Sequence, residues 1–119
     1  MSKLKAKHDV LIESIITDEN YSITEDGKIF TLITKNGKAG KTWREIGTPD
    51  KEGYKRIRYR GVRIFVHRIV YRKFCGPLDE TLVIDHKDAI TGNCHKDNLR
   101  LMDHKTNIYY RERRKDRTT

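Results

Sequence analysis

Residues 82–107 read LVIDHKDAITGNCHKDNLRLMDHKTN, and the order of side chains in this stretch decides the fold class. Apolar residues open it, a polar loop with Thr91-Gly92-Asn93 follows, and Asp103 supplies a residue type that caps helix N-termini. The pattern predicts a ββα unit. Its expected elements are a strand at 82–84, a loop at 87–97, a short strand in which Leu99 and Leu101 alternate with Arg100, and a helix at 105–115.

The region upstream predicts two β-hairpins. Residues 21–30 contain Asp26-Gly27, a dipeptide of tight hairpin turns. Residues 54–66 alternate charged with large side chains on both sides of Arg60-Gly61, which predicts a second, basic hairpin. A further turn is expected at 35–41, after which Trp43 and Ile46 fold back onto the first sheet.

Helical spacing is weaker in this upstream region. Residues 67–74 predict a short helix that Gly76-Pro77 ends, whereas residues 8–16 fit a helix and a strand about equally well. The expected fold class is α+β, with N-terminal antiparallel hairpins followed by the ββα unit at about 82–114. We expect one domain over 1–119, with a neutral β-rich region at 1–53 and a basic region at 54–119.

The positive charge of the chain lies in its second half. The 119 residues hold 26 Lys and Arg and 17 Asp and Glu, a net charge of +9. Residues 1–53 contain 9 basic and 9 acidic side chains, and residues 54–119 contain 17 and 8. Such a field attracts a polyanion such as nucleic acid, although a well-charged soluble surface has the same composition. Charge alone does not identify the target.

Several classes of protein are not indicated. Cys75 and Cys94 lack a Cys-x-x-Cys partner, so we expect reduced structural thiols rather than a zinc site or a disulfide framework. No apolar run approaches the roughly 18 to 20 residues of a membrane span, and residues 1–7 lack the apolar core of a signal peptide. The expected location is the cytoplasm, the host cytoplasm if a phage encodes the chain, with no membrane and no small-molecule cofactor.

Four polar residues are candidate active-site residues because of the order in which they occur in the sequence. Asp85-His86 ends the first strand, Asn98 follows twelve residues after His86, and Asn107 follows nine residues later on the helix. Each residue alone is ordinary, but the order resembles the HNH nuclease family, especially its phage homing-endonuclease branch. Upstream, Gly53-Tyr54-Lys55 and the segment from Val66 to Phe74 extend the resemblance to about half of the chain, and residues 66–107 are its specific part.

The resemblance implies a ββα-metal motif, also called a His-Me finger, and a role for each residue. It implies that Asp85 and Asn107 are ligands of one Mg²⁺ or Mn²⁺ ion, since both are hard cations that prefer oxygen ligands. Other divalent metals are alternatives. His86 becomes the general base, since a neutral imidazole can take a proton from water near neutral pH. Asn98 becomes the structural member, whose amide ties the loop backbone.

Other histidines leave alternatives open. The family's last His is Asn107 here, and His104, on a neighbouring part of the same helical face, is the alternative ligand, which would favour Zn²⁺ or Ni²⁺. His67 is expected to cap or pack at its helix. His95 is expected in the loop, exposed or near a phosphate, and His8 on the surface.

The resulting prediction is a metal-dependent DNA endonuclease that nicks one strand of double-stranded DNA per active site, phage-encoded, as a monomer or homodimer. The alternative is a catalytically inactive HNH-like protein that binds DNA or modulates a nuclease. An RNA-binding protein is disfavoured because no aromatic stacking platform is apparent. The candidate phosphate contacts, chosen by charge and position, are Arg56, Arg58, Arg60, Arg63, Arg111, Arg113 and Arg114.

Overall fold

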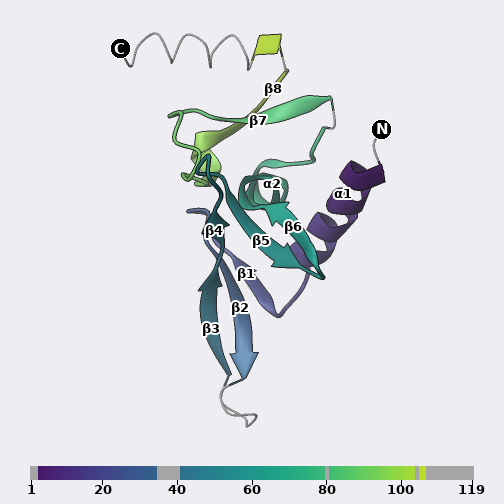
Figure 1. Ribbon diagram of the computed structural model, residues 1–119, viewed down its shortest axis with the longest axis vertical. Coiled ribbons are helices and arrows are strands. Elements are labelled where there is room, and N and C mark those ends of the chain that lie inside the picture. Colours follow the sequence, from purple (N-terminus) through teal and green to yellow (C-terminus); the bar gives the residue numbers. More distant parts are fainter. Residues whose placement is uncertain (1–2, 35–40, 80, 104, 107–119) are drawn as a thin grey trace.

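The computed structural model describes residues 3–34, 41–79, 81–103 and 105–106, and it places two helices against three small antiparallel sheets (Figure 1). The predicted α+β class is confirmed. Figure 1 shows the β2–β3 hairpin toward one end of the long axis and the β7–β8 hairpin toward the other. The elements of the first sheet are β1 (Tyr21–Ile23), β2 (Ile29–Thr34) and β3 (Lys41–Ile46), in the order β1-β2-β3.

The sequence did not distinguish a helix from a strand at residues 8–16. In the structure they belong to helix α1 (Lys3–Ile16). Ile12 and Ile15 are completely buried, whereas Val10 is 68% exposed. That three-residue spacing of buried positions belongs to one face of a helix and not to the alternation of a strand. Ion pairs from Asp9 to Arg68 and from Glu13 to Arg72 join α1 to the segment after the second sheet.

The second sheet contains the predicted basic hairpin. Its strands are β4 (Thr48–Pro49), β5 (Lys55–Tyr59) and β6 (Val62–Phe65), with β5 between the other two. Arg60 and Gly61 both adopt positive φ, +50° and +79°, as a two-residue type I′ hairpin turn requires. The predicted turn chemistry is therefore correct here.

Helix α2 (Val66–Val70) follows β6 directly and continues into a π-helical turn at Tyr71–Cys75. Gly76 then ends the helical segment at φ +146°, and its amide donates to the carbonyl oxygen of Tyr71. The predicted end at Gly76-Pro77 is confirmed. The third sheet pairs β7 (Leu82–His86) with β8 (Leu99–Asp103).

Strand β7 is two residues longer than predicted. The sequence suggested a strand at 82–84 running into Asp85-His86, but both residues are part of the ladder, with Asp85 opposite Arg100 and His86 opposite Leu99. The pairing extends because β8 begins directly after a 3₁₀ turn at Lys96–Asn98. The two candidate catalytic residues therefore have strand geometry.

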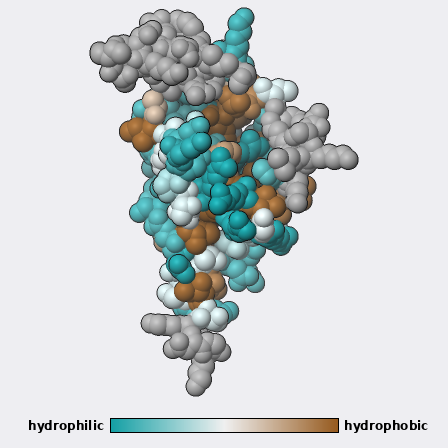
Figure 2. Space-filling view, viewed as in Figure 1, coloured by the Kyte–Doolittle hydropathy of each residue, from teal (hydrophilic) through white to brown (hydrophobic). Residues whose placement is uncertain are grey.

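The hydrophobic core draws on all three sheets and both helices. Its buried members are Ile12, Ile15, Ile23, Ile29, Ile57, Tyr59, Ile64, Val66, Ile69, Val70, Cys94 and Leu99. The predicted return of Trp43 onto the first sheet is confirmed by its pairing opposite Leu32, yet its side chain stays 47% exposed. Figure 2 shows hydrophobic surface divided into separate patches between hydrophilic areas. The expected turn at 35–41 lies mostly outside the described residues.

Cys75 and Cys94 are both free thiols in the structure. Cys94 lies in the core, where burial raises the pKa of its thiol to about 11, and Cys75 is exposed. Within the described ranges, neither helix has the length and apolar character needed to cross a bilayer.

Two turns from the first half of the chain hold the loop between β7 and β8. At the β1–β2 turn, the carbonyl oxygen of Glu25 accepts from the amide of Lys96 at 2.8 Å. At the turn before β5, the carbonyl oxygen of Glu52 accepts from the Thr91 hydroxyl at 2.8 Å. Gly27, at φ +89°, is in such close contact that an added Cβ would collide with the backbone of Cys94. The loop thus depends on contacts far away in sequence.

A pair of glycine substitutions tests this contact. Gly27→Ala should destabilise the protein by about 3 kcal/mol, because it adds steric overlap at Cys94 to the strain of a positive φ. Gly61→Ala is the matched control, since Gly61 has a similar φ of +79° with nothing within 4 Å of its Cβ position, and it should lose only about 1 kcal/mol. Urea unfolding measures both, and equal losses would contradict the contact.

Candidate active site at the end of strand β7

Asp85 and His86 lie next to each other at the end of β7, and both are buried. Asp85 is 3% exposed and His86 is 4% exposed. Because successive strand residues point to opposite faces, the two side chains lie on opposite faces of the β7–β8 hairpin. The strand end therefore presents a carboxylate and an imidazole in a setting largely shielded from water.

Arg100 contacts the carboxylate of Asp85. Its Nε donates to Asp85 Oδ2 at 3.0 Å, and 40% of the Arg100 side chain remains exposed. This charge-assisted hydrogen bond orients one carboxylate oxygen and offsets the desolvation of a buried charge. No local sequence pattern marks Arg100 as a site residue, because its position opposite Asp85 depends on the strand register.

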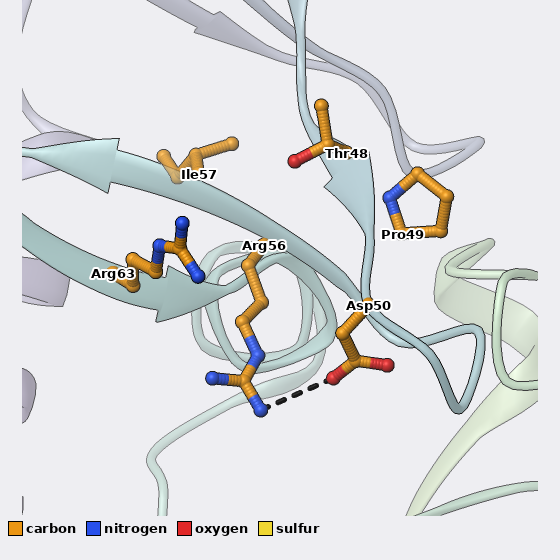
Figure 3. A pocket seen from close by; sticks show the side chains of 6 residues that line it. All are labelled: Thr48, Pro49, Asp50, Arg56, Ile57 and Arg63. Carbon is orange, nitrogen blue, oxygen red and sulfur yellow. Dashed lines mark ion pairs between the residues drawn. The ribbon is translucent and has the colours of Figure 1, made fainter.

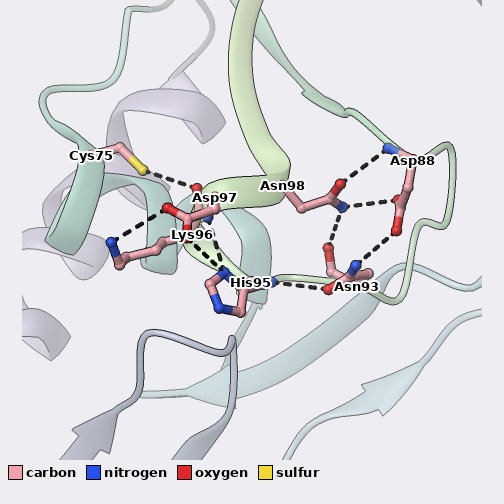
Figure 4. Close-up of polar contacts among 7 residues, drawn as sticks. All are labelled: Cys75, Asp88, Asn93, His95, Lys96, Asp97 and Asn98. Carbon is pink, nitrogen blue, oxygen red and sulfur yellow. Dashed lines mark hydrogen bonds and ion pairs between the residues drawn. The ribbon is translucent and has the colours of Figure 1, made fainter.

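Asn98 ties the two ends of the loop together (Figure 4). Its side-chain oxygen accepts from the Asp88 amide at 3.0 Å, and its Nδ2 donates to Asp88 Oδ1 at 3.0 Å and to the Asn93 carbonyl oxygen at 2.9 Å. Burial alone would raise the pKa of Asp88, but hydrogen bonds from Asn93, Ile90 and Asn98 hold it below the ordinary value. The loop is thus fixed directly after His86.

His95 has a local role in this loop. Its Nδ1 accepts from the Asp97 amide at 3.1 Å and caps the 3₁₀ turn, while 42% of the side chain is exposed (Figure 4). Nearby, the Cys75 thiol donates to the carbonyl oxygen of Lys96 at 3.5 Å, which joins the turn to the segment after α2.

His67 lies against His86, which the sequence did not reveal. Their ring centroids are 5.1 Å apart with an interplanar angle of 79°, and Tyr54 is 5.7 Å from each imidazole. His67 also stacks on Phe65, with ring centroids 5.0 Å apart. Burial, with further contributions from His86, Arg68 and Arg56, lowers the pKa of His67 to about 3. His67 therefore packs in a neutral form and does not cap α2, whose N-cap has no side-chain hydrogen bond.

The arginines of the basic hairpin share the solvent face of β5 and β6. Arg58 lies directly opposite Arg63, both are exposed, and neither forms an ion pair within the part of the chain that the structure describes. Arg56 pairs with Asp50 at 3.1 Å and covers the ring of Phe65 at 4.3 Å. Together with Thr48, Pro49, Asp50 and Ile57, Arg56 and Arg63 line a shallow pocket (Figure 3).

The remaining candidate residues divide into placed and unplaced ones. Arg60 is exposed at the hairpin turn, where its guanidinium lies 5.1 Å from the Tyr59 ring centroid. Asp103 accepts from the Thr106 amide at 2.8 Å, as expected of a helix cap, and the Thr106 hydrogen bonds lower its pKa. The predicted helix after Asp103 is seen only at Lys105 and Thr106. Outside the described residues lie His104, Asn107, Arg111, Arg113 and Arg114.

The candidate site lies within a segment that matches a known protein family. A model of the HNH endonuclease family matches residues 65–109, from the end of β6 through the β7–β8 hairpin. Residues 65–109 therefore form a segment of the HNH endonuclease type. The match includes His67, the Asp85-His86 pair and Asn98, and it confirms the resemblance seen in the sequence.

The chain is also similar in sequence and in structure to an HNH homing endonuclease. The DNA endonuclease I-HmuI of Bacillus phage SP01 is 33% identical over 93 residues, which are 75% of this chain and 49% of that protein. A solved structure of DNA binding and cleavage by the HNH homing endonuclease I-HmuI matches with a TM-score of 0.64 and 30% identity, over 87% of this chain and 56% of the other. The chain thus spans about half the length of the curated relative.

The donor set suits a hard cation with few protein ligands. Asp85 supplies a buried carboxylate at the site, and no cluster of three or more His, Cys, Asp or Glu able to hold a metal occurs among the described residues. A carboxylate with the remaining positions left to water and phosphate is the mode in which proteins commonly bind Mg²⁺. The buried carboxylate of Asp85 therefore suits a hard divalent cation.

Replacing Arg100 tests the support of Asp85. Arg100→Ala removes a charge-assisted hydrogen bond to a carboxylate that is 3% exposed, so the free energy of unfolding should fall by about 1 to 3 kcal/mol. Arg63→Ala is the control, because Arg63 is exposed, and it should change stability by less than about 0.5 kcal/mol. Urea unfolding without metal gives both values. Indistinguishable midpoints would show that Arg100 does not support Asp85.

Proposed function

We propose that this chain is a metal-dependent DNA endonuclease that nicks one strand of double-stranded DNA per active site. The observation that carries the proposal is the buried Asp85-His86 pair at the end of β7, inside the segment that matches the HNH family. The similarity to a phage DNA endonuclease supports DNA as the substrate and a phage origin, with action in the host cytoplasm. A monomer with one site nicks, and double-strand cleavage would need a homodimer or two events.

In this proposal Asp85 and Asn107 hold one Mg²⁺ or Mn²⁺ ion. When bound, the ion supplies Lewis-acid stabilisation of charge on the leaving oxygen of the phosphodiester. Arg100 holds Oδ2 of Asp85, which restricts the direction in which the carboxylate can bind a cation. His104 remains the alternative to Asn107 as the second ligand.

His86 acts as the general base that takes the proton from the attacking water. The backbone that follows it is held rigidly, because the Lys87 amide donates to the carbonyl oxygen of Asn98 at 2.8 Å and the Asn98 side chain fixes Asp88. Asn98 therefore contributes by positioning and does not need to touch the phosphate. The burial of His86 keeps bulk water from competing at its ring.

The solvent face of β5 and β6 forms the proposed phosphate-binding surface. Like charges directly opposite each other in a sheet are destabilising, so the exposed Arg58 and Arg63 pair favours an anionic partner. Arg56 connects this face to the site, since it covers Phe65, which in turn stacks on His67. Arg60 at the turn, and Arg111 and Arg114 after the site, complete the proposed set.

The first experiment is conversion of supercoiled plasmid to open-circle and linear forms with Mg²⁺, Mn²⁺ or EDTA. Wild-type protein should give open circles only with metal. His86→Ala should lower the rate by about 100-fold or more with DNA binding retained, because it removes the general base. His8→Gln, on α1, is the matched histidine control and should keep the wild-type rate.

Two results would overturn parts of the proposal. Wild-type cleavage by His86→Ala would remove His86 from the mechanism. Tight DNA binding without cleavage under every metal would favour the alternative, an inactive HNH-like protein that binds DNA or modulates a nuclease.

The salt dependence of DNA binding tests the arginine face. In the double variant Arg58→Ala/Arg63→Ala, the slope of log affinity against log salt concentration should decrease in magnitude by about 1.8, because each lost phosphate contact contributes roughly 0.9. Lys28→Ala is the control, since Lys28 lies beside Asp26 at 3.9 Å in the β1–β2 turn. Fluorescence anisotropy of a labelled duplex without metal measures the slope, and an unchanged slope would place the DNA elsewhere.

A further inference from the structure

Packing does not account for the nitrogen atoms of His67. The residue is 8% exposed, and its Nδ1 is buried with no hydrogen-bond partner among the residues that the structure describes. A buried polar nitrogen without a partner is costly, and a phenylalanine would fill the same aromatic environment without that cost. The imidazole therefore calls for a functional explanation.

The ring of the proposed base packs edge-on against His67. The centroids of His67 and His86 are 5.1 Å apart, and Nε2 of His86 is also buried from solvent. This centroid separation suits a direct N–H···N hydrogen bond, whose donor-acceptor distance is about 2.9 Å. Nδ1 of His67 makes no hydrogen bond within the described residues, so the proposed bond requires one of the two rings to turn about its Cβ–Cγ bond.

We propose that His67 is a positioning residue for His86. Its Nδ1 accepts the Nε2–H of His86, and this bond holds His86 in the tautomer whose bare Nδ1 can take a proton from water. The ring nitrogen that carries the proton in a histidine is commonly set by the hydrogen bond made at that nitrogen. This inference rests on the proposed role of His86 as general base.

The surroundings of His67 keep it a neutral acceptor. Arg68 on its own helix, Arg56 on β5 and His86 on β7 all disfavour a second positive charge, and burial lowers its pKa to about 3. Tyr54 and Phe65 hold the ring on its other sides. His67 is thus unsuited to be a base itself, and suited to orient one.

Two substitutions separate hydrogen bonding from packing. His67→Phe keeps an aromatic ring and removes both nitrogens, whereas His67→Asn keeps a polar group near the position of Nδ1 and loses the ring. If His67 acts as an acceptor, His67→Phe should lower kcat by about 10- to 100-fold with KM and DNA affinity little changed, and His67→Asn should retain more of kcat. If only packing matters, His67→Phe should be the more active variant, and that order would overturn the proposal.

Nitrogen-15 NMR of the histidine rings in the metal-free protein gives a readout that does not depend on cleavage. Wild type should show His86 with a protonated Nε2 and a bare Nδ1, and His67→Phe should show a mixture of tautomers. An unchanged His86 tautomer in His67→Phe would refute the inference. A different outcome is that His67→Phe changes the His86 tautomer while the wild-type protein cleaves no DNA. That outcome would refute the proposed function but not the interaction between the two rings.

Discussion

The antiparallel pairing of β7 with β8 is the constraint on which the candidate site depends. The register places Asp85 opposite Arg100 and His86 opposite Leu99, so one carboxylate oxygen receives a guanidinium donor while the imidazole enters a buried aromatic environment. A shift of one residue would turn both side chains to the opposite faces of the hairpin. The positions of the side chains in the candidate site therefore depend on the backbone hydrogen bonds that set the register of β7 and β8.

The loop between these strands is stabilised from two directions. Asn98 links its two ends internally, while the turns at Glu25 and Glu52 hold it from the first half of the chain. Residues 1–53 have no net charge, unlike the basic second half of the chain. Their contacts show that this region also supports the loop that follows His86.

Patterns local in sequence were predicted well, and contacts between distant segments were not. The Asp26-Gly27 and Arg60-Gly61 turns and the Asp103 cap each depend on a few adjacent residues, and all three are present. Asp85, His86 and Asn98 were selected as candidates by their order in the sequence, and their roles stay predictions. Arg100 and His67 were missed as site residues because their proximity to Asp85 and His86 depends on strand register and on the packing of α2, which no short motif specifies.

The Arg58 and Arg63 pair makes the protein's response to ionic strength depend on what is bound. In the free protein, added salt screens the repulsion between two guanidinium groups that face each other across β5 and β6, so the folded state should gain stability. In a complex with a polyanion, the same ions compete for the same surface and weaken association. One cross-strand pair thus makes added salt stabilise the folded protein and, at the same time, weaken its association with a polyanion.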